Sequence, residues 1–195
     1  MSEALTTADI AAAVRRMHAC SDAMRDDLNA ADRVLGDGDT GMTVASILGA
    51  WALAIQTPSS DVGTMLQQLG RETRRATGSS LGSVMAIGLI AAGKAVATPA
   101  VDRSAIAAML DAAADAISER SGASAGDKTI LDSVLAVRAA VASEANVTDA
   151  AARSLDDFRP REARIGRARM YGAKSAGHDD PGMLAALLLL RAAQS

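Results

Sequence analysis

The sequence contains few aromatic residues and a single cysteine. Trp51, Phe158 and Tyr171 are its only aromatic side chains, and Cys20 has no second cysteine with which to form an internal disulfide. A core without aromatic bulk must be built from Ala, Leu, Val, Ile and Met, a composition typical of helical proteins. A lone cysteine is also typical of proteins from a reducing compartment.

Other absences exclude whole classes of partner. The formal net charge of −3 provides no basic surface for nucleic acid or for an anionic membrane. The longest apolar runs, near residues 84–92 and 183–190, are too short to cross a bilayer. The first ten residues, MSEALTTADI, lack the basic and apolar regions of a signal peptide. We therefore expect a cytoplasmic protein that forms one domain over residues 1–195, without a nucleic-acid or membrane partner.

The sequence does contain strong helical periodicity. Apolar residues recur at spacings of three and four between Ile10 and Leu35, which predicts one long helix that stops at Gly36. Breaks at Pro58, Pro99 and the glycine-rich stretches divide the rest of the chain. Further helices are expected at about 41–56, 61–76, 80–97, 102–120, 127–145, 147–158 and 181–193. No stretch alternates like a strand, so we predict an all-α, single-domain barrel of about eight antiparallel, up-and-down helices.

Four polar, glycine-bearing motifs precede every second predicted helix. They are GDGDTG (36–41), TGSS (77–80), AGDK (125–128) and GHDDPG (177–182). In an up-and-down barrel these helices begin at the same end, so the motifs should meet at one rim. Helix N-termini offer unpaired N–H groups and positive dipole ends, which suit phosphate oxygens. Asp127 and Asp180 are the predicted N-caps of two of these helices, and capping alone would explain each motif taken singly.

Three familiar ligand motifs are excluded. Residues 36–41 match G-x-G-x-x-G, but no strand precedes them and their two aspartates would repel a bare pyrophosphate. The match to G-x-x-x-x-G-K at 88–94 lies inside an apolar helix and lacks the following Ser or Thr. An EF-hand is excluded because Leu48 stands where the bidentate Glu is required.

With these three motifs excluded, the loop residues favour metal binding. Asp32 lies one turn before the end of the first predicted helix, and Asp37 and Asp39 follow in the glycine-rich loop. A turn at Gly36 and Gly38 can bring the three carboxylates to a common centre. Hard oxygen ligands of this kind suit Mg²⁺, which takes its remaining ligands from water and substrate phosphates. The alternative is an Asp-Gly turn with a solvated acidic tip.

At this point four segments resemble a known family, the nucleotide-binding L subunit or L domain of dihydroxyacetone kinases. The segments are LNAADRVLGDGDTGMTV (28–44), TGSSLGSVMAIGL (77–89), GDKTILDSVLAV (126–137) and GRARMYGAKSAGHDDPG (166–182). The resemblance runs in the family's order from about residue 28 to the C-terminus. It implies a barrel of eight antiparallel helices with a nucleotide and two Mg²⁺ ions at one rim.

The resemblance also implies a role for particular residues. It assigns Mg²⁺ ligation to Asp32, Asp37 and Asp39, and with Arg167 these form the expected catalytic set. It implies contacts with ADP or ATP by residues in all four segments: Thr40, Gly41, Met42, Thr43, Ser79, Ser80, Ile130, Arg167, Asp180, Pro181 and Gly182.

The family's ketose-binding K domain has no room in this chain, so the ketose is expected on a separate K-type subunit. Family members that use ATP tend to read GDGDTG, whereas those served by a phosphoryl-carrier protein tend to read GDGDHG, so Thr40 favours ATP as the donor. Three alternatives stay open: a carrier-dependent subunit with ADP as its bound coenzyme, a non-catalytic nucleotide-binding regulatory module, and a barrel that holds a lipid.

Two basic residues near the motifs are expected to take no part in the chemistry. Lys128, in the first turn of a predicted helix, is interpreted as a solvated charge, and His178 as a structural residue of the rim. Lys174 stands where relatives often carry Arg, and it cannot make the same forked contact.

Overall fold

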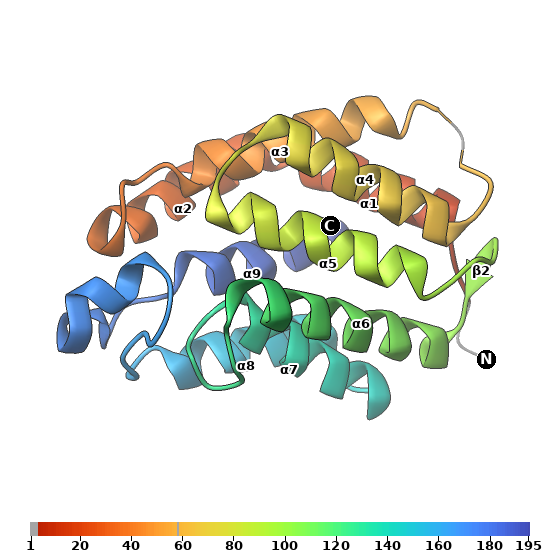
Figure 1. Cartoon of the computed structure of the whole chain (residues 1–195). Helices are drawn as coiled ribbons and strands as arrows, with labels where there is room; N and C mark the ends of the chain where they lie inside the picture. The colour runs from red at the N-terminus through yellow and green to blue at the C-terminus, as the bar shows by residue number, and fades with distance from the viewer. Residues whose placement is uncertain (1–3, 58) are drawn as a thin grey trace.

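Consecutive helices in the computed structural model run up and down and close into a barrel (Figure 1). The described residues, 4–57 and 59–195, form nine α-helices, one 3₁₀-helix and two short strands. The α-helices are α1 (Thr7–Ala19), α2 (Ser21–Leu35), α3 (Thr40–Ala54), α4 (Val62–Ala76), α5 (Ser80–Lys94), α6 (Arg103–Ser121), α7 (Ile130–Ala142), α8 (Val147–Phe158) and α9 (Pro181–Gln194); the 3₁₀-helix is η1 (Arg167–Ser175). The predicted all-α barrel is confirmed, and the predicted break at Pro58 lies outside the described residues.

The prediction of one long helix over residues 10–35 is wrong. Cys20, with φ −90° and ψ 1°, leaves helical geometry and divides this stretch into α1 and α2. The apolar residues on both sides of the break still pack together, because Val14 of α1 and Met24 and Leu28 of α2 lie in the same core cluster. The other predicted helices are present, with the largest differences at α5, which ends at Lys94, and at α7, which spans Ile130–Ala142.

Two strands that the sequence did not predict join the chain near its start to the α5–α6 connection. β1 (Leu5–Thr6) pairs antiparallel with β2 (Ala100–Val101), with Leu5 opposite Val101. Strands of two residues are too short to show alternation in a sequence, so the periodicity could not reveal them. They lie at the end of the barrel opposite the α2–α3 connection (Figure 1).

The barrel closes where the last helix meets the first ones. Each helix from α2 to α8 packs on the next along the chain, and α9 packs on α1, α2, α7 and α8. Trp51 is the one large aromatic residue in the main core cluster, and its Nε1 donates to the carbonyl oxygen of Leu69 (3.1 Å) and to Oγ1 of Thr73 (2.9 Å). No helix of the described residues combines the length and apolar character needed to cross a membrane.

The closed, up-and-down order gives every second helix the same starting end. α3, α5, α7 and α9 all begin at the end where η1 and the α8–α9 connection lie, on the left of Figure 1. Asp180 is the N-cap of α9 as predicted, with its Oδ1 accepting from the N–H of Met183 (2.8 Å). Asp127 is not the N-cap of α7: Thr129 is, in a capping box with Asp132, and Asp127 instead accepts from the N–H of Ser124.

Candidate functional site

The starts of α3, α5, α7 and α9 open into one pocket of about 480 Å³. Each helix contributes residues of its first turn or N-cap to the lining: Thr40 and Thr43 from α3, Ser79 and Ser80 from α5, Thr129 and Ile130 from α7, and Asp180, Pro181 and Gly182 from α9. Three of the four predicted motifs therefore contribute residues to one pocket. The AGDK motif (125–128) contributes none, and the start of α7 reaches the pocket through Thr129 and Ile130, which follow that motif. The dipoles of the four helices place partial positive charge around the pocket.

Three carboxylates gather on one side of this pocket. One oxygen from each of Asp32, Asp37 and Asp39 lies within 4.8 Å of the other two, and all three residues line the pocket. Asp32 is buried at the end of α2, whereas Asp37 and Asp39 are exposed in the loop that follows. Three hard oxygen donors, one from the end of α2 and two from the loop that follows, fit a divalent cation such as Mg²⁺, which keeps several waters and completes its shell with phosphate oxygens.

Side chains from α2 build the start of α3 in an unusual way. Oδ2 of Asp32 accepts from the N–H groups of Asp39 (2.9 Å) and Thr40 (3.2 Å), and Oδ1 of Asn29 accepts from Gly41 (2.8 Å). Asp39 occupies the N-cap position of α3, but its side chain makes no capping hydrogen bond. Because α2 satisfies these N–H groups, the Asp39 carboxylate is left to face the other two acids.

The charges in this cluster are partly unbalanced. Partial desolvation of its carboxyl group, and next the charge of Asp37, raise the pKa of the exposed Asp39 above its usual value. Asp37 is paired with Arg167 at the start of η1, and hydrogen bonding to that guanidinium lowers the pKa of Asp37. One arginine thus serves an acidic group of three, so the cluster retains net negative charge that a bound cation would neutralise.

Part of the pocket lining is apolar. This part includes Leu81 and Val84 of α5, Ile117 of α6, Ile130 of α7 and Ile165. Such a pocket suits a ligand with a polyanionic end and a flat, weakly polar end. The helix starts would then contact the anionic end directly, and the carboxylates would contact it through a bound cation.

The α9 side of the pocket contains a second perturbed acid. Burial raises the pKa of the Asp180 carboxyl to about 6, while hydrogen bonds from the N–H groups of Met183 and Gly182 and the nearby Lys128 ammonium oppose that shift. Asp180 therefore sits close to a protonation equilibrium while it caps α9.

Most of the residues predicted for the site lie on the pocket, and two do not. Gly41 is buried, its N–H is taken by Asn29, and a Cβ there would lie 2.1 Å from the carbonyl oxygen of Arg25, so it serves the packing of α3 on α2. Met42 is 54% exposed and is not among the residues that line the pocket.

Sequence reasoning missed several pocket residues, among them Thr129 and Arg120. Arg120 lies near the end of α6, and it reaches the rim because α2, α4, α6 and α8 end where α3, α5, α7 and α9 begin. The T-x-x-D pattern of a capping box would have identified Thr129 as the first residue at the rim.

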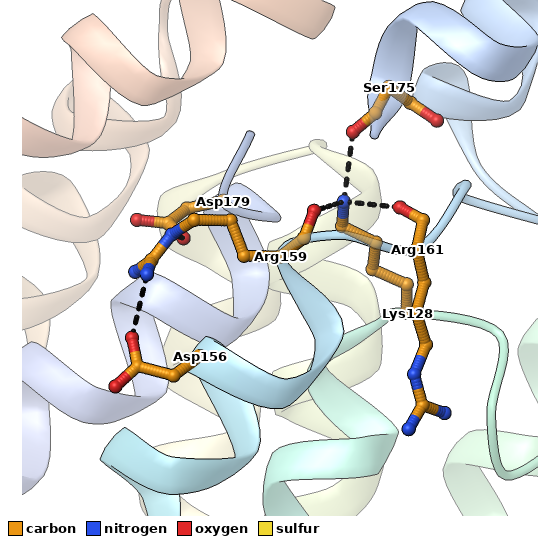
Figure 2. Close-up of polar contacts among 6 residues, drawn as sticks. All are labelled: Lys128, Asp156, Arg159, Arg161, Ser175 and Asp179. Carbon is orange, nitrogen blue, oxygen red and sulfur yellow. Dashed lines mark hydrogen bonds and ion pairs between the residues drawn. The ribbon is translucent and has the colours of Figure 1, made fainter. Parts of the chain in front are cut away.

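The interpretation of Lys128 as a solvated charge is wrong. Its residue surface is only 1% exposed, and its Nζ donates to the backbone carbonyl oxygens of Arg161 (2.8 Å), Ser175 (2.9 Å) and Arg159 (3.2 Å), as Figure 2 shows. Carbonyl groups brought from a distant segment satisfy the charge, which no pattern around residue 128 could indicate. His178 is exposed at the rim.

Comparison with known proteins connects this geometry to a family. Residues 34–195 match the family model of the DAK2 domain. The chain is 32% identical over 182 residues to L-erythrulose 1-kinase of Mycolicibacterium smegmatis, which covers 85% of this chain and 31% of that protein. It is 27% identical over 162 residues to the ADP-binding subunit DhaL of PEP-dependent dihydroxyacetone kinase 1 of Listeria innocua, which covers 83% of this chain and 82% of that subunit. The chain thus spans about a third of the first relative and most of the second.

Solved structures share the same fold. The dihydroxyacetone kinase of C. freundii in complex with AMP-PNP and Mg²⁺ superposes with a TM-score of 0.73 at 26% identity, over 97% of this chain and 34% of that one. The native form of the same enzyme gives a TM-score of 0.74 at 23% identity, over 94% of this chain and 33% of that one.

Proposed function

The chain belongs to the DAK2 domain family, which comprises the L subunits and L domains of dihydroxyacetone-type kinases, and from this premise we propose that it binds ATP or ADP with two Mg²⁺ ions in the rim pocket. In this function it supplies the phosphoryl group to a short ketose. The observation that carries the proposal is the meeting of three carboxylates and four helix starts in one pocket.

The acidic cluster is the proposed metal site. Asp32, Asp37 and Asp39 would hold the Mg²⁺ ions, and when bound these ions neutralise phosphate charge and orient the transferred group. Asp32 orients the loop through its bonds to the N–H groups of Asp39 and Thr40. Support for this assignment also comes from the Mg²⁺ named with AMP-PNP in the related C. freundii structure.

The remaining pocket residues divide between the two ends of the nucleotide. Thr40, Thr43, Ser79 and Ser80 line the pocket, and their hydroxyl groups are assigned to the phosphates. Ile130 is assigned to the base, and the start of α9, with Asp180, Pro181 and Gly182, is assigned to close over the nucleotide. Gly41 and Met42 are left out of the assignment because they do not line the pocket.

Arg167 is assigned to the transferring phosphoryl group. Its guanidinium pairs with Asp37 beside the cluster, so it is within reach of the same anionic ligand. A planar cation there would stabilise the charge that spreads over the phosphoryl oxygens during transfer. Because phosphoryl transfer depends mainly on positioning and charge neutralisation, the site requires no covalent nucleophile.

The ketose is proposed to bind on a K-type subunit that docks at this rim, with dihydroxyacetone or erythrulose as the substrate. The fused relative named L-erythrulose 1-kinase is about three times the length that this chain covers, which supports a second, separate unit for the sugar. ATP is proposed as the phosphoryl donor on the basis of Thr40.

A carrier-dependent subunit is the second candidate. The chain covers 82% and 84% of two separate ADP-binding subunits of PEP-dependent dihydroxyacetone kinases, from Listeria innocua and Escherichia coli. In that case ADP would stay bound as a coenzyme, and the phosphoryl group would come from a phosphoryl-carrier protein.

Reconstitution tests these two candidates together. The full chain is mixed with a K-type subunit, Mg²⁺ and dihydroxyacetone or erythrulose, with either ATP or PEP and its carrier proteins, and ketose phosphate is measured. Activity with ATP alone supports the first candidate and activity with PEP alone the second. Nucleotide binding without turnover in either mixture would favour a regulatory module.

Direct titration tests the metal role. Asp37→Asn should weaken Mg²⁺-dependent ADP binding by more than about tenfold, whereas Asp115→Asn, at an exposed position of α6, should leave binding unchanged. Lipid in organic extracts together with indifference to Asp37→Asn would favour the lipid-holding alternative.

A further inference from the structure

A buried lysine lies behind the pocket without lining it. Lys128 precedes Thr129, the N-cap of α7, with a positive φ of 64°. Figure 2 shows its side chain passing between the chain that leaves α8 and the end of η1. The residue is 1% exposed, and its Nζ has three carbonyl partners at 2.8 to 3.2 Å.

The three carbonyl groups belong to the two ends of one segment. Arg159 and Arg161 are the first and third residues after α8, and Ser175 is the last residue of η1. One ammonium therefore ties both ends of residues 159–175 to the start of α7. Arg167, the residue paired with Asp37, lies within the segment that is held in this way.

Further hydrogen bonds connect residues at the two ends of this segment. Oγ of the buried Ser175 accepts from the N–H of Ala163 (2.8 Å) and donates to the carbonyl of Gly172 (2.6 Å). The N–H of Gly177 donates to the carbonyl of Arg159 (2.7 Å). The lysine thus occupies the centre of a connected polar network and not an isolated hole in the core.

The lysine is suited to this place by its donors and its neighbours. An ammonium group has three donors and no acceptor, and the three carbonyl oxygens use all of them. Burial lowers the pKa of Lys128, and the charges of Asp180 and Asp179 oppose that shift. Asp179 also pairs with the Arg159 side chain (2.6 Å), so this acid contacts the first residue of the segment as well.

We propose that Lys128 is a positioning residue of the rim pocket: its ammonium clamps the two ends of residues 159–175 and thereby holds Arg167 and the Ile165 wall in place. The effect on nucleotide rests on the proposed function, whereas the clamp itself is a property of the chain. Lys128 itself neither lines the pocket nor belongs to the acidic cluster, so it acts through the residues that it holds.

Two substitutions distinguish the effect of the three Lys128 hydrogen bonds from the effect of the volume that its side chain fills. Lys128→Met keeps a long side chain but removes all three donors, and Lys128→Ala leaves room for n-propylammonium, which replaces the missing atoms and charge. Lys94→Met, at an exposed position at the end of α5, is the matched control. All variants are made in the full chain.

Hydrogen exchange and nucleotide titration provide the two measurements. In Lys128→Met, amides of residues 159–177 should exchange about tenfold or more faster than in the unsubstituted chain, while those of α3 and α4 keep their rates. The affinity for ADP with Mg²⁺ should fall by about tenfold, equivalent to 1.4 kcal/mol. Propylammonium should restore much of both properties to Lys128→Ala and neither to Lys128→Met, and Lys94→Met should match the unsubstituted chain.

The other outcomes overturn the proposal. Unchanged exchange in residues 159–177 of Lys128→Met would show that the clamp is unnecessary. Faster exchange with unchanged ADP affinity would show that the segment does not organise the pocket. Equal loss of protection in the segment and in α3 and α4, without rescue by propylammonium, would make Lys128 a general core residue. If the unsubstituted chain fails to bind ADP, the proposed function fails, and the exchange measurement still decides the clamp.

Discussion

Asp32 performs two tasks at the start of α3, and one pair of substitutions should separate them. Its carboxylate accepts two backbone N–H groups and also contributes an oxygen to the acidic cluster. Asp32→Asn keeps an acceptor oxygen for the backbone but removes the charge. Asp32→Ala removes both. We therefore expect the two variants to differ in stability without metal and to share the same loss of metal binding.

The expected changes in stability follow from the hydrogen bonds and charges around Asp32. Without the capping oxygen, Asp32→Ala should lose about 1–2 kcal/mol of unfolding free energy. Asp32→Asn should be at least as stable as the unsubstituted chain without metal, because it also removes a like charge from beside Asp39. Mg²⁺ at 100 times its Kd should stabilise the unsubstituted chain by about 2.7 kcal/mol, roughly 5–11 °C in Tm for a domain of this size.

Thermal unfolding with and without Mg²⁺, at matched ionic strength, measures these effects. The unsubstituted chain should gain stability with Mg²⁺, and both variants should lose most of that gain. An Asp32→Asn protein with the full Mg²⁺ increment would refute the metal role of Asp32. Equal stability of Asp32→Ala and the unsubstituted chain without metal would refute its capping role.

Three further predictions concern buried polar groups. The pKa of Asp180 is about 6 in the folded chain, above its ordinary 3.8, so its protonated form favours folding at low pH and this contribution is lost as the pH rises through 6. In urea unfolding, the free energy of unfolding of Asp180→Asn should exceed that of the unsubstituted chain by up to about 3 kcal/mol at pH 7 and by little at pH 4. A constant difference across this range would contradict the assignment. Trp51→Phe removes the donor to Thr73 and should lower the unfolding free energy, followed by circular dichroism, by about 1–3 kcal/mol. Asn29→Ala leaves the buried N–H of Gly41 unpaired and should destabilise the chain by about 1–2 kcal/mol in the same assay, and an unchanged midpoint would show that water replaces the side chain.

The position of the site could be predicted from the sequence because it depends on connectivity. Helical periodicity and short connections predict antiparallel neighbours, and such an order brings the four polar motifs to one end whatever the details of packing. The break at Cys20 was not predictable from periodicity, because α1 and α2 keep the same apolar spacing on both sides of it. Where two cap formers compete, as Asp127 and Thr129 do, the choice depends on Asp132, which bonds back to the N–H of Thr129.

The buried environment of Lys128 could not be predicted from the sequence. Its neighbours in sequence are a glycine-rich turn and a helix start, features that normally place a lysine in water. Its burial instead depends on carbonyl groups that lie 31 to 47 residues away, just after α8 and at the end of η1. Local patterns contain no information about such partners, so a buried charge satisfied by backbone from another segment is the kind of feature that sequence reasoning misses.

The capping of α3 explains how an acidic loop can exist at a helix start. Of the four helix starts described around the pocket, those of α5, α7 and α9 are capped by their own N-cap residues, Ser79, Thr129 and Asp180. At α3 the same task falls to Asn29 and Asp32 of the preceding helix, so the N-cap carboxylate of Asp39 makes no bond to its own helix. If Asp39 capped α3 in the ordinary way, the cluster would lose one of its three oxygens to a backbone N–H. The arrangement of the acidic cluster therefore also depends on Asn29, a neutral residue outside the pocket lining, which takes the N–H of Gly41.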